Sequence, residues 1–309
     1  MSYEDGMLNR IDRKRQQGVY EKAERLERAD DIKSSIERLV PLELDNAREY
    51  IDSQSIKIED FGDLYDEQVI EDDQKEVQRL KEVFAKNDQS VLPNGVTMGQ
   101  MRQLSEITEA YLLRGINESN WIPHCKGIKT SEYDDYKNGV DMVLEYERAD
   151  RPARHIGLGV DVTFSSSIER KLSQIKKEID AGTLSTIKYF NSHNSHIHDR
   201  LIQVPRAVVG FDINSIKRLA KSRRIHGELP QEDTLRFVTL HQLDMQMETF
   251  TDYAKKISSP SKDVLDRTHH FIGLLKRFVI ENNRYDPQTV ENNEQLKNFK
   301  SALRSFDTL

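Results

Sequence analysis

Two aspartates interrupt apolar, strand-like segments in the middle of this 309-residue chain. Asp141 lies in the run GVDMVLEY, and Asp161 lies twenty residues later in GVDVTF. An aspartate between valines in a half-buried strand needs a partner to offset its lost hydration, so these positions are chemically unusual. Neighbouring antiparallel strands could bring the two carboxylates together, and oxygen ligands of this kind suit Mg²⁺. The same alternation could instead turn both side chains toward solvent on an ordinary sheet.

A histidine-rich segment and the single cysteine offer two other possible sites. The segment NSHNSHIHD contains His193, His196 and His198, whose imidazoles could bind Zn²⁺, but a polar surface loop is the simpler interpretation. The segment WIPHC places His124 beside Cys125. No residue that would orient such a pair for catalysis is evident, so a core position is favoured for the cysteine.

Charge is distributed unevenly along the chain. Residues 59–73 contain eight carboxylates and no basic residue, whereas residues 217–224 contain five cations in eight positions. The cations that could contact a nucleic-acid backbone are Lys217, Arg218, Lys221, Arg223 and Arg224. Both segments could equally be solvated helix faces. The net charge of −7 argues against a protein that coats nucleic acid, but it permits an enzyme with a local basic cleft.

The composition indicates a helix-rich protein of the cytoplasm. Charged residues make up 32% of the chain and hydrophobic residues 36%, a balance typical of amphipathic helices. No apolar run is long enough to cross a membrane, and the N-terminal residues lack the apolar segment of a secretory signal. One cysteine cannot form an internal disulfide. We therefore expect a cytoplasmic protein with no membrane partner.

Hydrophobic periodicity divides the chain into three regions. Apolar residues recur every three or four positions over 7–40 and 66–86, so residues 1–90 are predicted to form a helical arm or hairpin. Residues 97–225 are predicted to form a mixed α/β core. Its expected helices cover 97–114, 166–182 and 213–224, and its expected strands cover 138–147, 155–164, 186–190 and 203–212. Residues 230–309 are predicted to be helical again, and the helical regions could bind a protein partner or a second copy of the chain.

The order of elements over about residues 100–225 resembles the PD-(D/E)XK, or restriction-endonuclease-like, nuclease superfamily. The resemblance implies an αβββαβ core in which one strand carries Asp141 and the next carries the triplet Asp161-Val162-Thr163. Thr163 stands where members of the superfamily carry a lysine. The fold class implied is α+β, with this core flanked by N-terminal and C-terminal helical regions.

The resemblance also implies the remaining site residues. The preceding helix would supply an acid, here Glu106 or Glu109. Where the triplet lacks its lysine, the following helix can supply one, and Lys171 is the first candidate before Lys176.

The resemblance implies a hydrolase that cleaves phosphodiester bonds in nucleic acid with Mg²⁺ or Mn²⁺. Asp141 and Asp161 would bind the metal, with the backbone carbonyl of Val162 as a further ligand. The metal would activate a water molecule, and Lys171 would place a cation near that water or the phosphate. The alternative is a catalytically inactive nuclease-like fold that serves as a protein-interaction or nucleic-acid-binding module.

Overall fold

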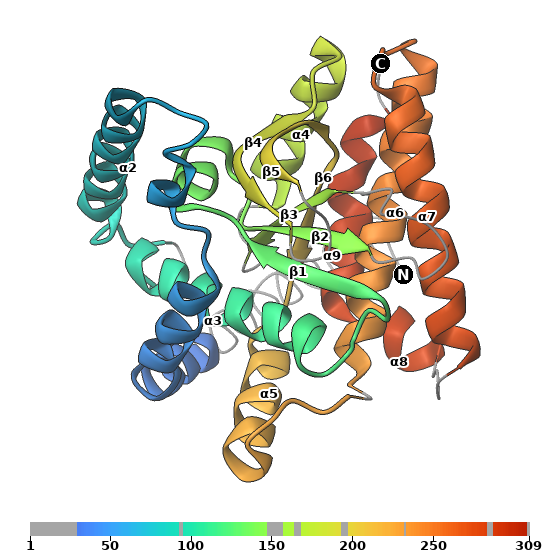
Figure 1. Cartoon of the computed structure of the whole chain (residues 1–309). Helices are drawn as coiled ribbons and strands as arrows, with labels where there is room; N and C mark the ends of the chain where they lie inside the picture. The colour runs from blue at the N-terminus through green and yellow to red at the C-terminus, as the bar shows by residue number, and fades with distance from the viewer. Residues whose placement is uncertain are drawn as a thin grey trace, which may run out of the picture.

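The structure is a computed structural model. In it, helices surround a small mixed sheet (Figure 1). It describes residues 30–92, 95–146, 157–163, 168–192, 197–231, 233–282 and 287–307. The predicted combination of helices and strands is confirmed at the level of fold class. Among the described residues, no helix combines the length and the apolar character that a membrane span requires.

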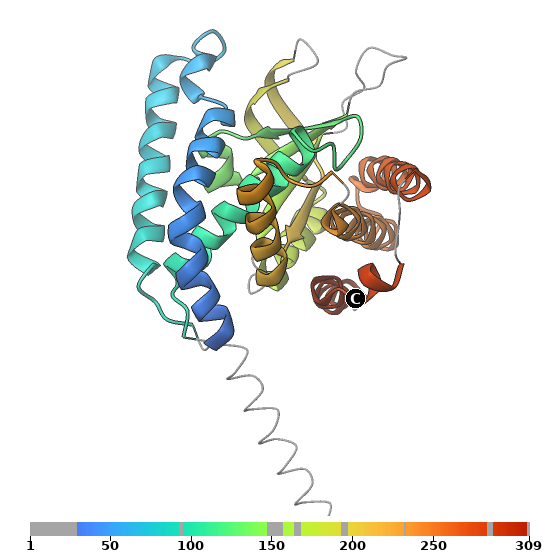
Figure 2. The ribbon, with the colours of Figure 1, turned by 90° about the horizontal axis from the view of Figure 1, so that it is seen from below.

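The N-terminal region is helical where the structure describes it. One helix covers residues 30–54, a short 3-10 turn follows at Ile58–Phe61 (η1), and α2 spans Glu67–Asn87. The helix predicted over 66–86 is therefore confirmed, while most of the segment predicted over 7–40 lies outside the described residues. Figure 2 shows these helices on one side of the sheet and the C-terminal helices on the other.

Four strands form the central sheet. They are β1 (Cys125–Lys129), β2 (Met142–Tyr146), β3 (Leu158–Thr163) and β6 (Arg206–Gly210), and they lie side by side in that order. The first three are antiparallel neighbours, whereas β6 runs parallel to β3. The antiparallel pairing predicted for the segments 138–147 and 155–164 is confirmed, and the turn that joins them lies outside the described residues.

A second sheet and one helix lie between β3 and β6 in the chain. Helix α4 spans Ile168–Ala181, and β4 (Ser185–Asn191) pairs antiparallel with β5 (His198–Val204). The prediction of a surface loop through His198 is wrong, because that residue begins β5. Strand β5 is mostly exposed, so its sequence lacks the alternating apolar residues that mark a half-buried strand. The strand predicted over 203–212 is divided at Pro205, which has no N–H to donate to a ladder.

The helices around the sheet begin and end at capping residues that the sequence supplies. Helix α3 (Met98–Asn117) begins with a capping box formed by Thr97 and Gln100, and it packs against β1 and β3. Helix α5 (Ile213–His226) begins at Asp212, whose side chain accepts the Ser215 N–H. The C-terminal elements are α6 (Thr234–Lys256), α7 (Lys262–Glu281), α8 (Pro287–Glu291), α9 (Glu294–Leu303) and a 3-10 turn at Arg304–Phe306 (η3).

Helix α6 closes the open edge of the sheet at β6. The side chain of Gln246 accepts the Val208 N–H at 2.9 Å and donates to the Val208 carbonyl at 2.7 Å. Gln242 makes the same pair of bonds with Gly210. The two glutamines thus replace the neighbouring strand that an exposed edge would otherwise invite. One hydrophobic cluster runs from Ile36 in the N-terminal helix through this interface, so all three predicted regions share a core.

Candidate metal centre

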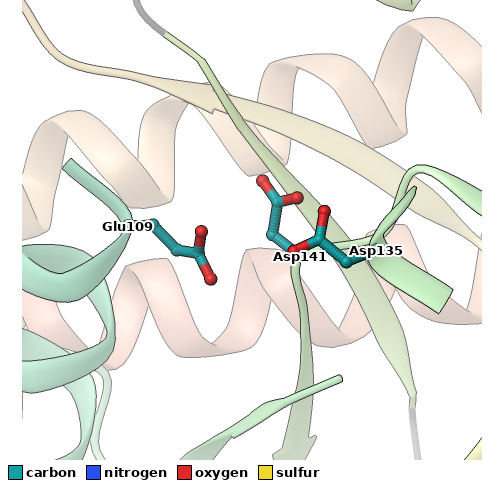
Figure 3. A group of neighbouring side chains, drawn as sticks. All are labelled: Glu109, Asp135 and Asp141. Atoms are coloured by element: carbon teal, nitrogen blue, oxygen red, sulfur yellow. The ribbon is translucent and has the colours of Figure 1, made fainter. Parts of the chain in front are cut away.

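Acidic side chains from three elements converge beside the start of β2. Glu109 comes from α3, Asp135 from a short π-helix (η2, Asp134–Asn138), and Asp141 directly precedes β2. One carboxylate oxygen from each lies within 4.8 Å of the others, and Figure 3 shows Glu109 facing the two aspartates. Oxygen ligands at this spacing suit a hard divalent cation such as Mg²⁺.

A buried lysine lies within this acidic cluster. The Nζ atom of Lys129, the last residue of β1, is 2.8 Å from Oε1 of Glu109 and 2.6 Å from Oδ2 of Asp135. Its side chain is only 4% exposed. Burial lowers the pKa of this ammonium, but the charges of Asp135, Glu109 and Asp141 outweigh burial and raise the pKa overall. Lys129 therefore remains charged and neutralises part of the cluster.

The predicted lysine from α4 reaches the second aspartate. The Lys171 ammonium forms an ion pair with Asp161 and donates to the Val162 carbonyl at 2.8 Å. Asp161 itself is buried within β3. The second candidate, Lys176, donates to the Ser305 carbonyl near the C-terminus instead. Of the two lysines, Lys171 is thus the one that the fold brings to the site.

Asp141 connects the acidic cluster to the Asp161 pair. Its Oδ2 atom accepts the Val162 N–H at 2.5 Å, and its own N–H donates to the Val160 carbonyl at 3.0 Å. Burial raises the pKa of Asp141 well above its ordinary value, and the charges of Asp135, Asp161 and Glu109 raise it further. The expectation that Asp141 lies within a strand is wrong by one residue. It stands immediately before β2, where the chain arrives from the π-helix.

The structure distinguishes between the two candidate acids of α3. Glu109 faces the cluster, and burial raises its pKa from 4.5 to about 7 although Lys129 opposes the rise. Glu106 instead forms an ion pair with Arg48 of the N-terminal helix at 2.7 Å. Of the two candidate acids, Glu109 is therefore the one that the fold brings to the cluster.

A second buried cation, Arg206, holds the backbone that leads to Asp141. The Arg206 side chain is 1% exposed and donates to Oε1 of Glu178 at 2.6 Å. It also donates to the carbonyls of Asn138 and Gly139, at 3.1 and 3.0 Å. These bonds fix the end of the π-helix just before Asp141. Arg206 was not among the predicted site residues, because nothing in its local sequence shows that β6 lies beside β3.

Asp134 holds the π-helix that presents Asp135. The fully buried Asp134 carboxylate accepts the hydroxyl of Ser131 at 2.8 Å and the side-chain amide of Asn138 at 2.7 Å. It also accepts the backbone N–H groups of Lys188 and Tyr189 in β4. Single π-helical turns are rare and occur frequently at functional sites. Asp135 and Lys129 were both missed by sequence reasoning, and the charged run SEYDDYK was the one available signal for Asp135.

Most of the basic residues of α5 contact other parts of the protein. Arg223 and Arg224 lie 3.2 and 3.4 Å from the buried Glu43 carboxylate, and Arg218 pairs with Asp233 at 2.8 Å. Lys217 donates to the hydroxyl of Ser35 at 3.1 Å, whereas Lys221 is exposed. Four of the five cations thus help to hold α5 against neighbouring segments.

The histidine and cysteine segments contribute no ligands to this cluster within the described residues. His198 stacks on Phe61 with ring centroids 4.2 Å apart, while His193 and His196 lie outside the described residues. Cys125 is buried, and burial raises its pKa to about 12. A thiol with that pKa is not a nucleophile at neutral pH, which agrees with its expected core position.

Comparison of the chain with protein-family models, curated proteins and solved structures found no match. Function must therefore be inferred from the chemistry of the site itself.

Proposed function

We propose that this protein is a Mg²⁺-dependent phosphodiesterase acting on nucleic acid, and a divergent member of the PD-(D/E)XK superfamily. The observation that carries the proposal is the position of Lys171, whose ammonium contacts both Asp161 and the Val162 carbonyl. A lysine from the following helix thus stands beside the acidic triplet residue, although Thr163 occupies the usual lysine position.

The order of elements supports the same proposal. Helix α3 precedes three antiparallel strands, β1 to β3, and α4 then leads toward β6, which is parallel to β3. This order of elements supports assignment to the αβββαβ core that the resemblance implies, with the β4–β5 hairpin as an addition before the last strand.

The charge of the site favours a divalent cation. Among the described residues around the cluster, five carboxylates face three basic side chains. The carboxylates belong to Glu109, Asp135, Asp141, Asp161 and Glu178, and the basic groups to Lys129, Lys171 and Arg206. An excess of two negative charges is costly in a buried cluster unless a cation or protons compensate for it. One Mg²⁺ or Mn²⁺ ion would supply the missing charge.

The residues of the site divide the chemistry between them. Asp141 and Asp161 would hold the cation, with the Val162 carbonyl as a further ligand. The Val162 N–H donates to Asp141, and the Val162 carbonyl accepts from Lys171. A bound Mg²⁺ ion lowers the pKa of its water ligand and stabilises negative charge on a phosphate. Lys171 would orient the attacking water or a phosphate oxygen through charge-assisted hydrogen bonds. Glu109 adds a third carboxylate from α3, beside Asp135 and Asp141.

The test compares cleavage of single- and double-stranded DNA and RNA by the wild type and by Asp161→Ala, with Mg²⁺, Mn²⁺ or EDTA. We expect metal-dependent cleavage that the substitution lowers on the order of 100-fold or more, because the cation loses a ligand. Asp266→Ala is the matched control, since this exposed aspartate pairs with Lys255 in α6, at 2.6 Å. Absence of cleavage by folded wild-type protein with either metal would refute the proposal.

The second candidate function is a catalytically inactive nuclease-like module that binds nucleic acid or a protein partner. One observation favours it, because Lys129 and Lys171 already form ion pairs with three carboxylates of the site. Binding of labelled DNA and RNA in EDTA distinguishes this candidate. An inactive binding module would bind without cleaving, and its affinity would fall steeply with salt if phosphates are contacted.

A further inference from the structure

We infer that Lys129 is a permanent cation of the Glu109–Asp135 side of the site, so that the centre takes one divalent ion and not two. The inference rests on the proposed function, because it assigns the number and place of the ions in the same site. It makes Lys129 a positioning residue, which acts on the reaction by determining where a metal can bind.

The position of the ammonium group excludes a second ion at the same carboxylates. Nζ of Lys129 lies 2.8 Å from Glu109 and 2.6 Å from Asp135, and thus between the two groups. A Mg²⁺ ion bound by the same oxygens would require metal–oxygen distances of about 2.0–2.1 Å. Two cations cannot share this space, because their mutual repulsion is strong in a poorly hydrated site. A metal ion could enter between Glu109 and Asp135 only by displacing the lysine.

The Lys129 side chain cannot turn toward solvent without a change in the packing around it. Its side chain is 4% exposed, and its backbone lies in β1 opposite Met142 of β2. A long side chain on a surface loop could turn toward solvent, but this one is enclosed by the strand and by α3. The ammonium is therefore a fixed part of the site.

The charge of the site points to the same number of ions. With Lys129 in place and all five carboxylates ionised, the described carboxylates around the cluster exceed the basic groups by two charges, which one divalent ion balances. A second divalent ion would leave the site positive by two charges before substrate binds. Removing Lys129 increases the negative excess to three and vacates the space between Glu109 and Asp135.

Counting bound Mn²⁺ ions tests the inference without any measurement of activity. Mn²⁺ is added to the full chain, and electron paramagnetic resonance of the free ion gives the number bound. We expect one ion in the wild type and two in Lys129→Met. Lys276→Met is the matched control, because Lys276 also pairs with an aspartate at 2.6 Å, but on α7 and away from the site. This control should bind one ion, with wild-type affinity.

Each outcome decides between the two proposals. Two ions in the wild type, or one ion in both proteins with unchanged affinity, would overturn the role of Lys129 and leave the proposed metal-dependent function standing. No ion in the wild type would overturn the proposed function, and the role of Lys129 would fall with it if Lys129→Met also bound none. If Lys129→Met does not fold, a count of two ions in the wild type would still overturn the role of Lys129. The double variant Lys129→Met/Glu109→Gln, which preserves the net charge, should fold and bind one ion.

Discussion

Replacing Glu109 by glutamine is expected to stabilise the metal-free protein, although it removes a buried ion-pairing group. The Glu109 side chain is 9% exposed. Burial is the main cause that raises its pKa from 4.5 to about 7, and the charge of Asp135 adds to the rise while Lys129 opposes it. The ionised carboxylate is thus less stable in the folded protein than in the unfolded chain.

The sign and size of the effect follow from linkage between protonation and folding. Because the folded pKa lies above the unfolded value, the stabilising contribution of Glu109 is fully present below pH 4.5 and is lost as the pH rises through about 7. A tenfold difference in proton affinity corresponds to about 1.4 kcal/mol, so the loss at high pH is on the order of 3 kcal/mol. Glutamine carries no charge and avoids this loss. Glu109→Gln should therefore exceed the wild type in stability by roughly 2–3 kcal/mol at about pH 8, and by less at about pH 5.

Urea unfolding in EDTA between about pH 5 and pH 8 measures this difference. Glu106→Gln is the matched control on the same helix. The ion pair between Glu106 and Arg48 is partly exposed, so we expect this control to lower the free energy of unfolding by at most about 1 kcal/mol. The reasoning would be refuted if Glu109→Gln were less stable than the wild type at the higher pH, or if the difference between them did not change with pH.

Three further substitutions probe the elements that position the site, each by urea unfolding. Arg206→Met should lower the free energy of unfolding by about 3–5 kcal/mol, because the Glu178 carboxylate loses a buried partner at 2.6 Å. Asp134→Ala should lower the free energy of unfolding by about 2–3 kcal/mol, because four groups that donate hydrogen bonds to this buried carboxylate lose their acceptor. Gly115→Ala should cost about 1–3 kcal/mol, because the added Cβ would overlap the indole ring of Trp121.

Controls for these substitutions are available in the same chain. Arg206→Met/Glu178→Gln should recover part of the loss, because it leaves no buried carboxylate without a cation. A single Arg206→Met protein within about 1 kcal/mol of the wild type would contradict the role given to this residue. Gly273→Ala in α7 meets only an ordinary contact with Asp244, at 3.8 Å, and should gain up to about 1 kcal/mol. A similar gain in Gly115→Ala would show that the space beside Trp121 is not filled.

Local sequence determined much of the secondary structure and two residues of the site. The boundaries of α3 and α5 follow from Thr97 and Asp212, because a helix begins where a side chain can accept the first free N–H groups. Strands β3 and β6 follow from their β-branched residues, whereas β1 contains only one such residue and was not among the predicted strands. Asp141 and Asp161 stood out because a carboxylate within an apolar run demands a partner, whatever the fold around it.

Only the tertiary structure decided which other groups surround those aspartates. Lys129, Asp135 and Arg206 reach the site from β1, the π-helix and β6. No local pattern marks Lys129 or Arg206, and Asp135 is signalled only by the charged run around it. The choice of Lys171 over Lys176 depended on which side of α4 faces β3. The basic run of α5 suggested a nucleic-acid surface, yet Glu43, 180 residues from Arg223, pairs with it in the fold. Spacing along a chain fixes hydrogen bonds within an element, whereas charge pairing between distant elements depends on how those elements pack.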